Sequence, residues 1–315
     1  MCLLNINTNM QKIIVIYGPT ASGKSKLAID LAKSLSSKKQ PAVIINADSM
    51  QVYREIPIIT AQPNIEDKKD FPHSLYGFLP ATTACSAGMW AQIAKDKIDK
   101  AWQNNLLPIL VGGTGLYIKT LMYGIAQTPE TLTEIRKKAN ALLKEVGNIK
   151  FHKLVSEFDP ETAEKLLPTN SQRLLRAWEI FEQTGEPLSN WHKKPNKTYF
   201  SDPSIFECYF LSPPREKIYE NVNKRFSAMV ENGAIEEVAA LKKLSLPKHY
   251  PAMKAHGVPE IIKYLNGEMT LEDAIDKAKQ NTRNYVKRQF TWFKNQMPEF
   301  KSIQCSASCI LNTEH

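Results

Sequence analysis

The first residues that could do chemistry are Gly18-Pro19-Thr20-Ala21-Ser22-Gly23-Lys24-Ser25, directly after the apolar run 13–17. Glycines let a backbone fold around an anion with its N–H groups pointing inward, and the helix expected from Lys24 adds its positive end. Lys24 supplies a full charge, and the Ser25 hydroxyl can coordinate Mg²⁺. The segment predicts a phosphate-binding loop, typical of nucleotide-binding and ATP-binding proteins, where phosphoryl transfer is the usual chemistry.

A second polar segment, Asn46 to Arg54, follows the apolar run 42–46. Its carboxylate, Asp48, could bind Mg²⁺ through water, act as a general base or cap a helix. Ser49 and Gln51 lie within three positions of it and offer hydrogen bonds that suit a base edge. This density of polar groups favours a functional role.

A third segment, Gly112-Gly113-Thr114-Gly115-Leu116-Tyr117, follows the apolar run 107–111. Its glycines permit close approach of backbone or ligand, and Thr114 can contribute a hydroxyl. An arginine-rich middle region would also suit the lid of a nucleotide kinase, so this segment alone leaves that alternative open.

Basic residues recur further along the chain. Arg173 and Arg176 share a helix face, which suits either RNA phosphates or a solvated basic edge, while Leu174 and Leu175 are expected to be buried. Arg215 and Arg225 are ten positions apart, roughly 15 Å along a helix, so one of them could reach a diphosphate. A late stripe at 283–288 is a candidate for the RNA backbone, with the aromatic residues of 290–293 expected in the core.

The elements that must position these groups form an α/β pattern. Unalternating apolar strands at 13–17, 42–46, 107–111 and 205–211, joined by helices at 24–36 and 86–104, predict a parallel sheet covered on both faces. Ligands collect at the carboxyl ends of such strands, so the three polar segments should converge on one cleft. Further helices are expected at 215–233, 235–244 and 271–293.

Between 129 and 196 helical periodicity replaces strand signals. We expect helices at 133–146, 151–158, 160–166 and 172–184. The predicted organisation is a discontinuous core of residues 11–128 and 197–300, a helical insertion at 129–196 and a flexible tail at 301–315.

Bulk properties agree with a basic globular protein. The net charge is +9 and the pI about 9.1, which suits a polyanionic partner such as RNA without excluding an ordinary basic enzyme. Five scattered cysteines suggest neither a disulfide framework nor a metal site and fit the cytoplasm. No apolar stretch is long enough for a membrane span, and residues 1–10 lack the pattern of a secretory signal. Nothing points to an obligate interface, so a monomer is expected.

Taken in order, the phosphate loop, D-S-x-Q-x-Y at 48–53, G-G-T-x-L-Y at 112–117, Gln172-Arg173 and K-R-Q-x-T-W-F at 287–293 resemble the tRNA dimethylallyltransferases, or IPP transferase family. The resemblance runs from about residue 12 to about residue 295. It implies a core like that of the P-loop NTPases and a helical insertion that grips the anticodon stem-loop. It also implies transfer of a dimethylallyl group from dimethylallyl diphosphate to N6 of adenosine 37 in tRNA, with Mg²⁺ and release of pyrophosphate.

The resemblance also implies roles for residues of this chain. Asp48, Thr20 and Lys24 would be catalytic, Ser25 would hold the metal, and residues 18–25 with Arg215 or Arg225 would bind the diphosphate. The residues that would contact tRNA are Asp48, Ser49, Met50, Gln51, Thr114, Arg136, Gln172, Arg173, Leu174, Leu175 and Arg176. One segment, Ala255 to Glu260, departs from the Gly-Tyr pair of many members, and Pro259 removes a backbone donor there.

Three alternatives stay open at this point. One is a nucleoside or nucleotide kinase, which would need ATP where a prenyltransferase consumes dimethylallyl diphosphate. Another is an isopentenyltransferase acting on free adenine nucleotides, against which the basic insertion favours a large RNA substrate. The third is a non-catalytic RNA-binding module, against which stand the intact Lys24, Ser25 and Asp48.

Overall fold

The computed structural model describes residues 11–297, 301–303 and 310. The chain divides into two compact units, one of residues up to Met122 together with those from Tyr199 onward, the other Tyr123–Thr198. The first unit is an α/β unit and the second is helical.

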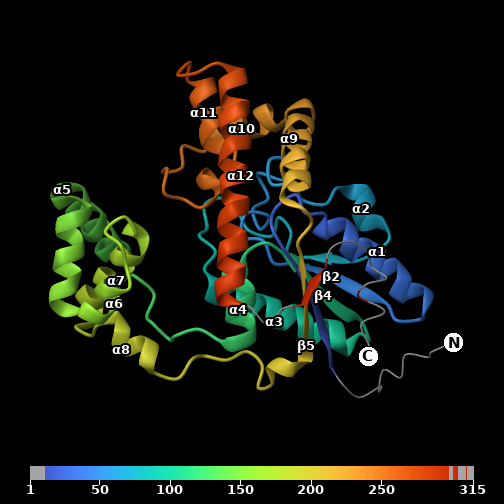
Figure 1. The fold of residues 1–315 in the computed structure, drawn as a ribbon, viewed down its shortest axis with the longest axis horizontal. Helices are drawn as coiled ribbons and strands as arrows, with labels where there is room; N and C mark the ends of the chain where they lie inside the picture. Colours follow the sequence, from blue (N-terminus) through green and yellow to red (C-terminus); the bar gives the residue numbers. More distant parts are fainter. Residues whose placement is uncertain (1–10, 298–300, 304–309, 311–315) are drawn as a thin grey trace. The chain divides into compact units, whose positions relative to one another are not determined.

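A parallel sheet forms the centre of the α/β unit (Figure 1). Within the described residues its order is β3-β2-β4-β1-β5-β6. The strands are β1 (Ile13–Tyr17), β2 (Ala42–Asn46), β3 (His73–Ser74), β4 (Leu107–Gly112), β5 (Phe206–Leu211) and β6 (Lys301–Ile303). The helices are α1 (Lys24–Ser37), α2 (Ile65–Lys69), α3 (Ala87–Gln103), α4 (Gly115–Tyr123), α9 (Arg215–Glu231), α10 (Ala234–Lys243), α11 (Val258–Leu265) and α12 (Leu271–Gln296), with 3₁₀ turns at Pro203–Ile205 and Ala252–Lys254.

The register brings the polar segments to one edge of the sheet. Tyr17 at the end of β1 pairs with Gly112 at the end of β4, and Asn46 at the end of β2 pairs with Val111. All paired strands run parallel, so the three turns that follow β1, β2 and β4 leave the sheet on the same side. The convergence expected from the sequence is therefore present.

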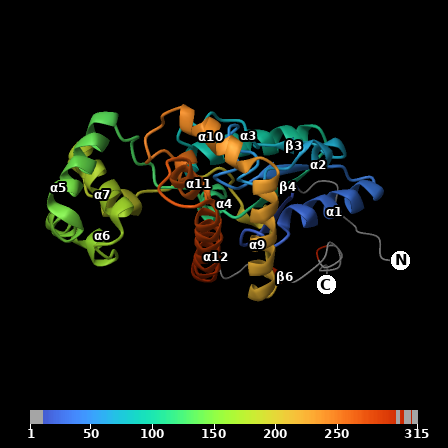
Figure 2. The same ribbon diagram turned by 90° about the horizontal axis from the view of Figure 1, so that it is seen from above.

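Helices cover both faces of the sheet. Alternate residues such as Ile14, Ile16 and Ile44 pack with Leu27 and Leu31 of α1. Because side chains alternate along a strand, the intervening residues face the opposite side, where α3 lies (Figure 2). These two layers bury β1, β2 and β4, as their unalternating apolar sequences predict.

Helices α9 and α12 lie side by side (Figure 1) and pack through Ile218, Val222 and Val286. The ring of Phe293 meets that of Tyr17 edge to face, so α12 also reaches the end of β1. In the turn after β4, a Cβ on Gly115 would overlap the Trp292 ring. Glycine at this position therefore permits α4 to start directly against α12.

The helical unit contains α5 (Thr133–Phe158), α6 (Pro160–Glu164), α7 (Ser171–Thr184) and α8 (Leu188–Lys193). Helix α5 is broken at Gly147, whose φ of 75° and ψ of 167° are not helical, so two helices follow each other as expected. A core of its own includes Phe151, Val155, Leu174 and Ile180.

The first residues of the predicted flexible tail, 301–315, form a strand in the structure. Lys301–Ile303 form β6, which pairs with β5 from Tyr209 to Leu211, and the Ser212 N–H donates to the Ile303 carbonyl at 3.0 Å. Ile303 and Ile310 are buried against the core. Two apolar residues in so short a segment are too few to predict a strand from the sequence. Residues 304–309 and 311–315 lie outside the described part of the chain.

Over the described ranges, every helix is too short or too polar to cross a bilayer.

Candidate active site

A pocket of about 570 Å³ opens where the turns after β1, β2 and β4 meet α9. We call it the phosphate pocket. Its lining includes most of the residues expected in the phosphate loop, together with Asp48, Gln51 and Arg225. The other lining residues include Lys26, Thr60, Ala61, Val111, Gly112, Asn221, Lys224 and Ala228.

The phosphate loop is held in a curled conformation by its own contacts. The Ser22 N–H and the Lys24 ammonium both donate to the Pro19 carbonyl, at 3.3 and 2.7 Å. Gly23 adopts a φ of 96°, which glycine tolerates, and α1 starts at Lys24. The pocket that this loop borders is lined by four lysine and arginine side chains: Lys24, Lys26, Lys224 and Arg225.

Burial lowers the pKa of Lys24 from 10.5 to about 8. Asp48 opposes this shift, and Arg225 adds to it. A polyanion in the pocket would favour the charged ammonium and reverse the penalty, since opposite charges stabilise each other's ionised forms.

Helix α9 contributes further lining residues to the phosphate pocket and contacts the phosphate loop. Arg225 Nη2 donates to the Thr20 hydroxyl at 2.5 Å, and Asn221 Nδ2 donates to the Ala21 carbonyl at 3.1 Å. Burial lowers the pKa of Arg225, with Asp48 opposing. Of the two arginines considered from sequence, Arg225 lines the phosphate pocket, whereas Arg215 is not among the described residues lining it and lies over the Phe290 ring at 5.8 Å.

Asp48 is fixed by a tight turn. Its N–H donates to the Asn46 side-chain oxygen and its Oδ1 accepts from the Met50 N–H, both at 2.9 Å. Its Oδ2 lies 3.7 Å from the position that a Cβ on Gly113 would occupy. One carboxylate oxygen therefore shapes the turn, while the other faces the Gly113 backbone.

The neighbouring polar residues connect the turns. The Thr114 hydroxyl accepts from the Ser49 N–H at 2.9 Å and donates to the Ser49 hydroxyl at 3.1 Å. The Gln51 amide donates to the carbonyls of Thr60 and Ala61 at 2.9 and 2.8 Å. These contacts make the segments after β2 and β4 one hydrogen-bonded assembly.

A smaller pocket of about 170 Å³ lies beside the first. We call it the aromatic pocket, lined by Gly113, Thr114, Gly115, Leu116, Tyr285, Arg288, Gln289, Trp292 and Phe293. Gln289 separates the two: its side-chain oxygen accepts from the Thr20 N–H and its amide donates to the Gly113 carbonyl, both at 2.9 Å. An ionic pocket and an apolar pocket thus adjoin at Asp48, Gly113 and Gln289.

Gln289, Asn221 and Lys224 were given no role from the sequence. The signal for Gln289 was its place in a buried helical stripe with Ala278, Thr282, Val286 and Phe293. A glutamine in such a stripe needs an internal partner, because burying an unpaired amide is costly. For Asn221 and Lys224 no sequence signal distinguished them from other polar residues of an amphipathic helix.

The phosphate pocket fits a diphosphate with a magnesium ion. The buried hydroxyl of Ser22 in the phosphate loop has no hydrogen-bond partner within the described chain. Ser25 is exposed in the same pocket as Asp48 and offers a hard oxygen. No group of three or more His, Cys, Asp or Glu in the described ranges could hold a metal alone, so ligand oxygens and water would complete the shell, as Mg²⁺ prefers.

His256 lies at a third pocket of about 270 Å³, with Glu260 and Arg288. Its ring packs against Tyr285 with 4.6 Å between centroids, and burial, followed by Arg288, lowers its pKa. Pro259 is in the first turn of α11, where a backbone N–H has no intrahelical partner, so the missing donor costs the helix nothing.

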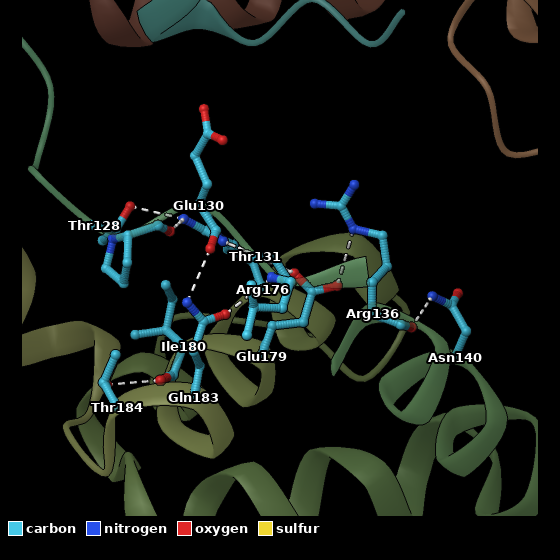
Figure 3. A network of polar contacts seen from close by, with 12 residues as sticks. Thr128, Glu130, Thr131, Arg136, Asn140, Arg176, Glu179, Ile180, Gln183 and Thr184 are labelled. Carbon is cyan, nitrogen blue, oxygen red and sulfur yellow. Dashed lines mark hydrogen bonds and ion pairs between the residues drawn. The ribbon is translucent and has the colours of Figure 1, made fainter. Parts of the chain in front are cut away.

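In the helical unit a polar network ties the segment 128–132 to α7 (Figure 3). Arg176 donates to the hydroxyls of Thr128 and Thr131 and to the Pro129 carbonyl. The buried Glu179 accepts from Thr131 and lies 3.6 Å from Arg136 Nε. Arg176 is thus committed to internal contacts, whereas the outer nitrogens of Arg136 point away from the network (Figure 3).

The other residues expected to meet RNA differ in exposure. Gln172 and Arg173 are exposed at the start of α7, and Leu175 is half-buried. Leu174 is 0% exposed in the core of the helical unit, so its side chain does not reach a surface that RNA could contact. The helical period that places Arg173 outside places Leu174 inside.

Comparisons with known proteins match most of the chain. The model of the IPP transferase family matches residues 51–296, and that of isopentenyl transferases matches 11–70. A tRNA dimethylallyltransferase of Wolbachia pipientis subsp. Culex pipiens is 45% identical over 294 residues, covering 93% of this chain and 96% of the relative. That of Ehrlichia canis is 43% identical, covering 92% and 93%.

Solved structures agree with these matches. A tRNA isopentenylpyrophosphate transferase from Bacillus halodurans superposes with a TM-score of 0.65 at 32% identity, covering 93% of this chain and 90% of its own. A eukaryotic dimethylallyltransferase acting on tRNA gives a TM-score of 0.75 at 25% identity, covering 96% and 76%. With its phosphate loop, its Asp48 turn and these matches, the chain belongs to the IPP transferase family of tRNA dimethylallyltransferases.

Proposed function

We propose that this protein transfers a dimethylallyl group from dimethylallyl diphosphate to N6 of adenosine 37 in tRNA and releases pyrophosphate. The single observation that carries the proposal is the position of Asp48 where a cationic pocket and an aromatic pocket adjoin. Such a junction would place an anionic donor next to a purine.

The diphosphate binds in the phosphate pocket. The phosphate loop, together with Lys24 and Arg225, stabilises the negative charge that grows on the departing pyrophosphate. Ser25 would hold a Mg²⁺ ion in this pocket, and the ion would supply further charge neutralisation when bound. Arg225 also orients the Thr20 hydroxyl through their hydrogen bond.

The purine approaches from the aromatic pocket, where the rings of Tyr285 and Trp292 suit a base extruded from its stack. Asp48 orients the exocyclic amine and takes its proton as the C–N bond forms. The allylic carbon leaves its diphosphate oxygen, and pyrophosphate carries away that electron pair. Atoms and charge therefore balance without a further reactant.

The helical unit binds the anticodon stem-loop. The exposed Arg136, Gln172 and Arg173 support this assignment, and Arg176 positions the segment 128–131 that precedes α5. Contacts from Ser49, Met50, Gln51, Thr114 and Leu175 belong to the same proposal. The reaction is assigned to a monomer acting in the cytoplasm, with no membrane partner.

The test is incubation of an unmodified anticodon stem-loop RNA with labelled dimethylallyl diphosphate and Mg²⁺. Label is expected on adenosine 37, with one pyrophosphate released per label. A stem-loop with guanosine 37 is the matched control and should remain unlabelled. Absence of label from the adenosine RNA, or ATP consumption in its place, would reject the proposal.

A further inference from the structure

The Glu237 carboxylate of α10 is hydrogen-bonded to a turn outside its own helix. Its Oε2 accepts from the Ile58 N–H and its Oε1 from the Ile59 N–H, both at 2.8 Å. A carboxylate that accepts two successive backbone N–H groups makes strong, charge-assisted bonds and fixes their direction. Neither the phosphate pocket nor the aromatic pocket includes Glu237, so it has no role in the reaction described above.

The gripped segment is a compact turn that needs outside support. The Gln62 N–H donates to the Pro57 carbonyl at 2.9 Å, and the Ala61 N–H donates to the Ile58 carbonyl at 3.0 Å. Ala61 adopts a φ of 54°, a left-handed conformation that costs free energy in a residue other than glycine. Such a conformation persists only where surrounding contacts impose it.

The inner side of the turn belongs to the phosphate pocket. Thr60 and Ala61 line it, and their carbonyls accept both hydrogen bonds of the Gln51 amide. Gln51 lies three residues after Asp48 in the same segment. The turn is therefore bound on one side by Glu237 and on the other by Gln51 of the segment that carries Asp48. No described residue of the turn lines the aromatic pocket.

We propose that Glu237 is a positioning residue for the diphosphate donor. It keeps the 58–61 turn seated, so that Thr60, Ala61 and Gln51 retain the shape of the phosphate pocket. The inference rests on the proposed function and adds to it a specific consequence: loss of this carboxylate weakens use of the donor more than use of the RNA, because Thr60 and Ala61 of the turn line the phosphate pocket.

The test compares Glu237→Gln with Glu236→Gln. The amide of Glu237→Gln can accept with one atom only, and its NH₂ group opposes the second backbone N–H. Glu236 precedes it on the same helix and is exposed, so Glu236→Gln removes the same charge and leaves the turn intact. We expect the KM for dimethylallyl diphosphate to rise about tenfold in Glu237→Gln, with the KM for RNA within about twofold of wild type.

Amide hydrogen exchange supplies a second readout. The Ile58 and Ile59 amides should exchange faster in Glu237→Gln and at the wild-type rate in Glu236→Gln. If Glu237→Gln does not fold, Glu237→Asp takes its place, because the shorter side chain keeps the charge but cannot reach both N–H groups.

Equal donor KM values in the two variants, an equal rise in the KM for RNA, or unchanged exchange at Ile58 and Ile59 would overturn the inference. A wild-type protein without transferase activity would instead reject the proposed function. Exchange at the two amides would still report on the grip of Glu237 in that case.

Discussion

Thr20 and Gln289 are joined by a hydrogen bond of 2.9 Å although 269 positions separate them in the chain. Gln289 uses its other end to hold the Gly113 carbonyl, also at 2.9 Å. A single buried side chain therefore fixes the distance between the phosphate loop and the turn after β4. Because the phosphate pocket and the aromatic pocket adjoin here, this distance sets how the two substrates meet.

Replacing Gln289 with Leu should impair both halves of the site. Two buried backbone groups lose their partners, which should lower the free energy of unfolding by about 2 kcal/mol. Since both pockets share the residue, kcat should fall together with the affinity for each substrate. Urea unfolding and steady-state kinetics check this, with Gln280→Leu on the exposed side of α12 as control.

Asp48→Asn tests the proton acceptor. The asparagine oxygen can still accept from the Met50 N–H, so the turn should survive. We expect kcat to fall about 10²- to 10⁴-fold while the Kd for the stem-loop RNA stays unchanged, since only the base is lost. Unaltered kcat would remove Asp48 from this role. Asp70→Asn is a charge-matched control on an exposed residue.

The Lys24 ammonium predicts a pH dependence. Its pKa of about 8 means that the free protein carries this charge below pH 8 and loses it above. Hence kcat/KM for dimethylallyl diphosphate should decline as pH rises through about 8. Lys24→Arg, which stays charged, should flatten this limb. A wild-type profile that is flat from pH 7 to 10 would contradict the prediction.

The same shift has a consequence for stability. Between about pH 8 and 10.5 the unfolded chain holds the Lys24 proton and the folded chain does not. The contribution of Lys24 therefore opposes folding fully below pH 8 and is relieved as pH rises toward 10.5. Comparing urea unfolding of wild type and Lys24→Met at pH 7 and 10 should show a gain in stability for the variant that is larger at pH 7.

Arg173→Ala and Arg176→Ala should separate binding from structure. Arg173 is exposed, so its loss should weaken RNA binding, reduce the salt slope of log Kd by about 1 and leave unfolding unchanged. Arg176 holds Thr128 and Pro129, so its loss should lower the stability of the helical unit by about 1 to 3 kcal/mol. Salt-dependent binding titrations and thermal unfolding distinguish the two.

Local sequence signals were sufficient for the elements that carry the site. The strands before Gly18, Asp48 and Gly113 are buried on both faces, so their apolar runs identified them together with the parallel sheet. Within the helical unit, periodicity located the helices around Gly147.

Contacts between distant segments were beyond such signals. Arg225 and Arg215 share one helix, and only the packing of α9 distinguishes the one that reaches Thr20. The same holds for Glu237, whose partners are backbone N–H groups with no side-chain pattern to reveal them. Arg176 lies in a basic motif that suggests RNA binding, yet in the structure its side chain makes hydrogen bonds within the helical unit.

The pairing of β1 bears on how the chain is made. One neighbour of β1, β5, begins at Phe206, and its partner across the sheet is Ile13. On the ribosome, β1 therefore emerges long before this neighbour and presents an open strand edge while residues 123–198 are synthesised. Those residues carry their own core and can fold first. A chain terminated before Phe206 retains the phosphate loop but leaves one edge of the strand that leads into it without its partner, and such an edge can pair with another chain.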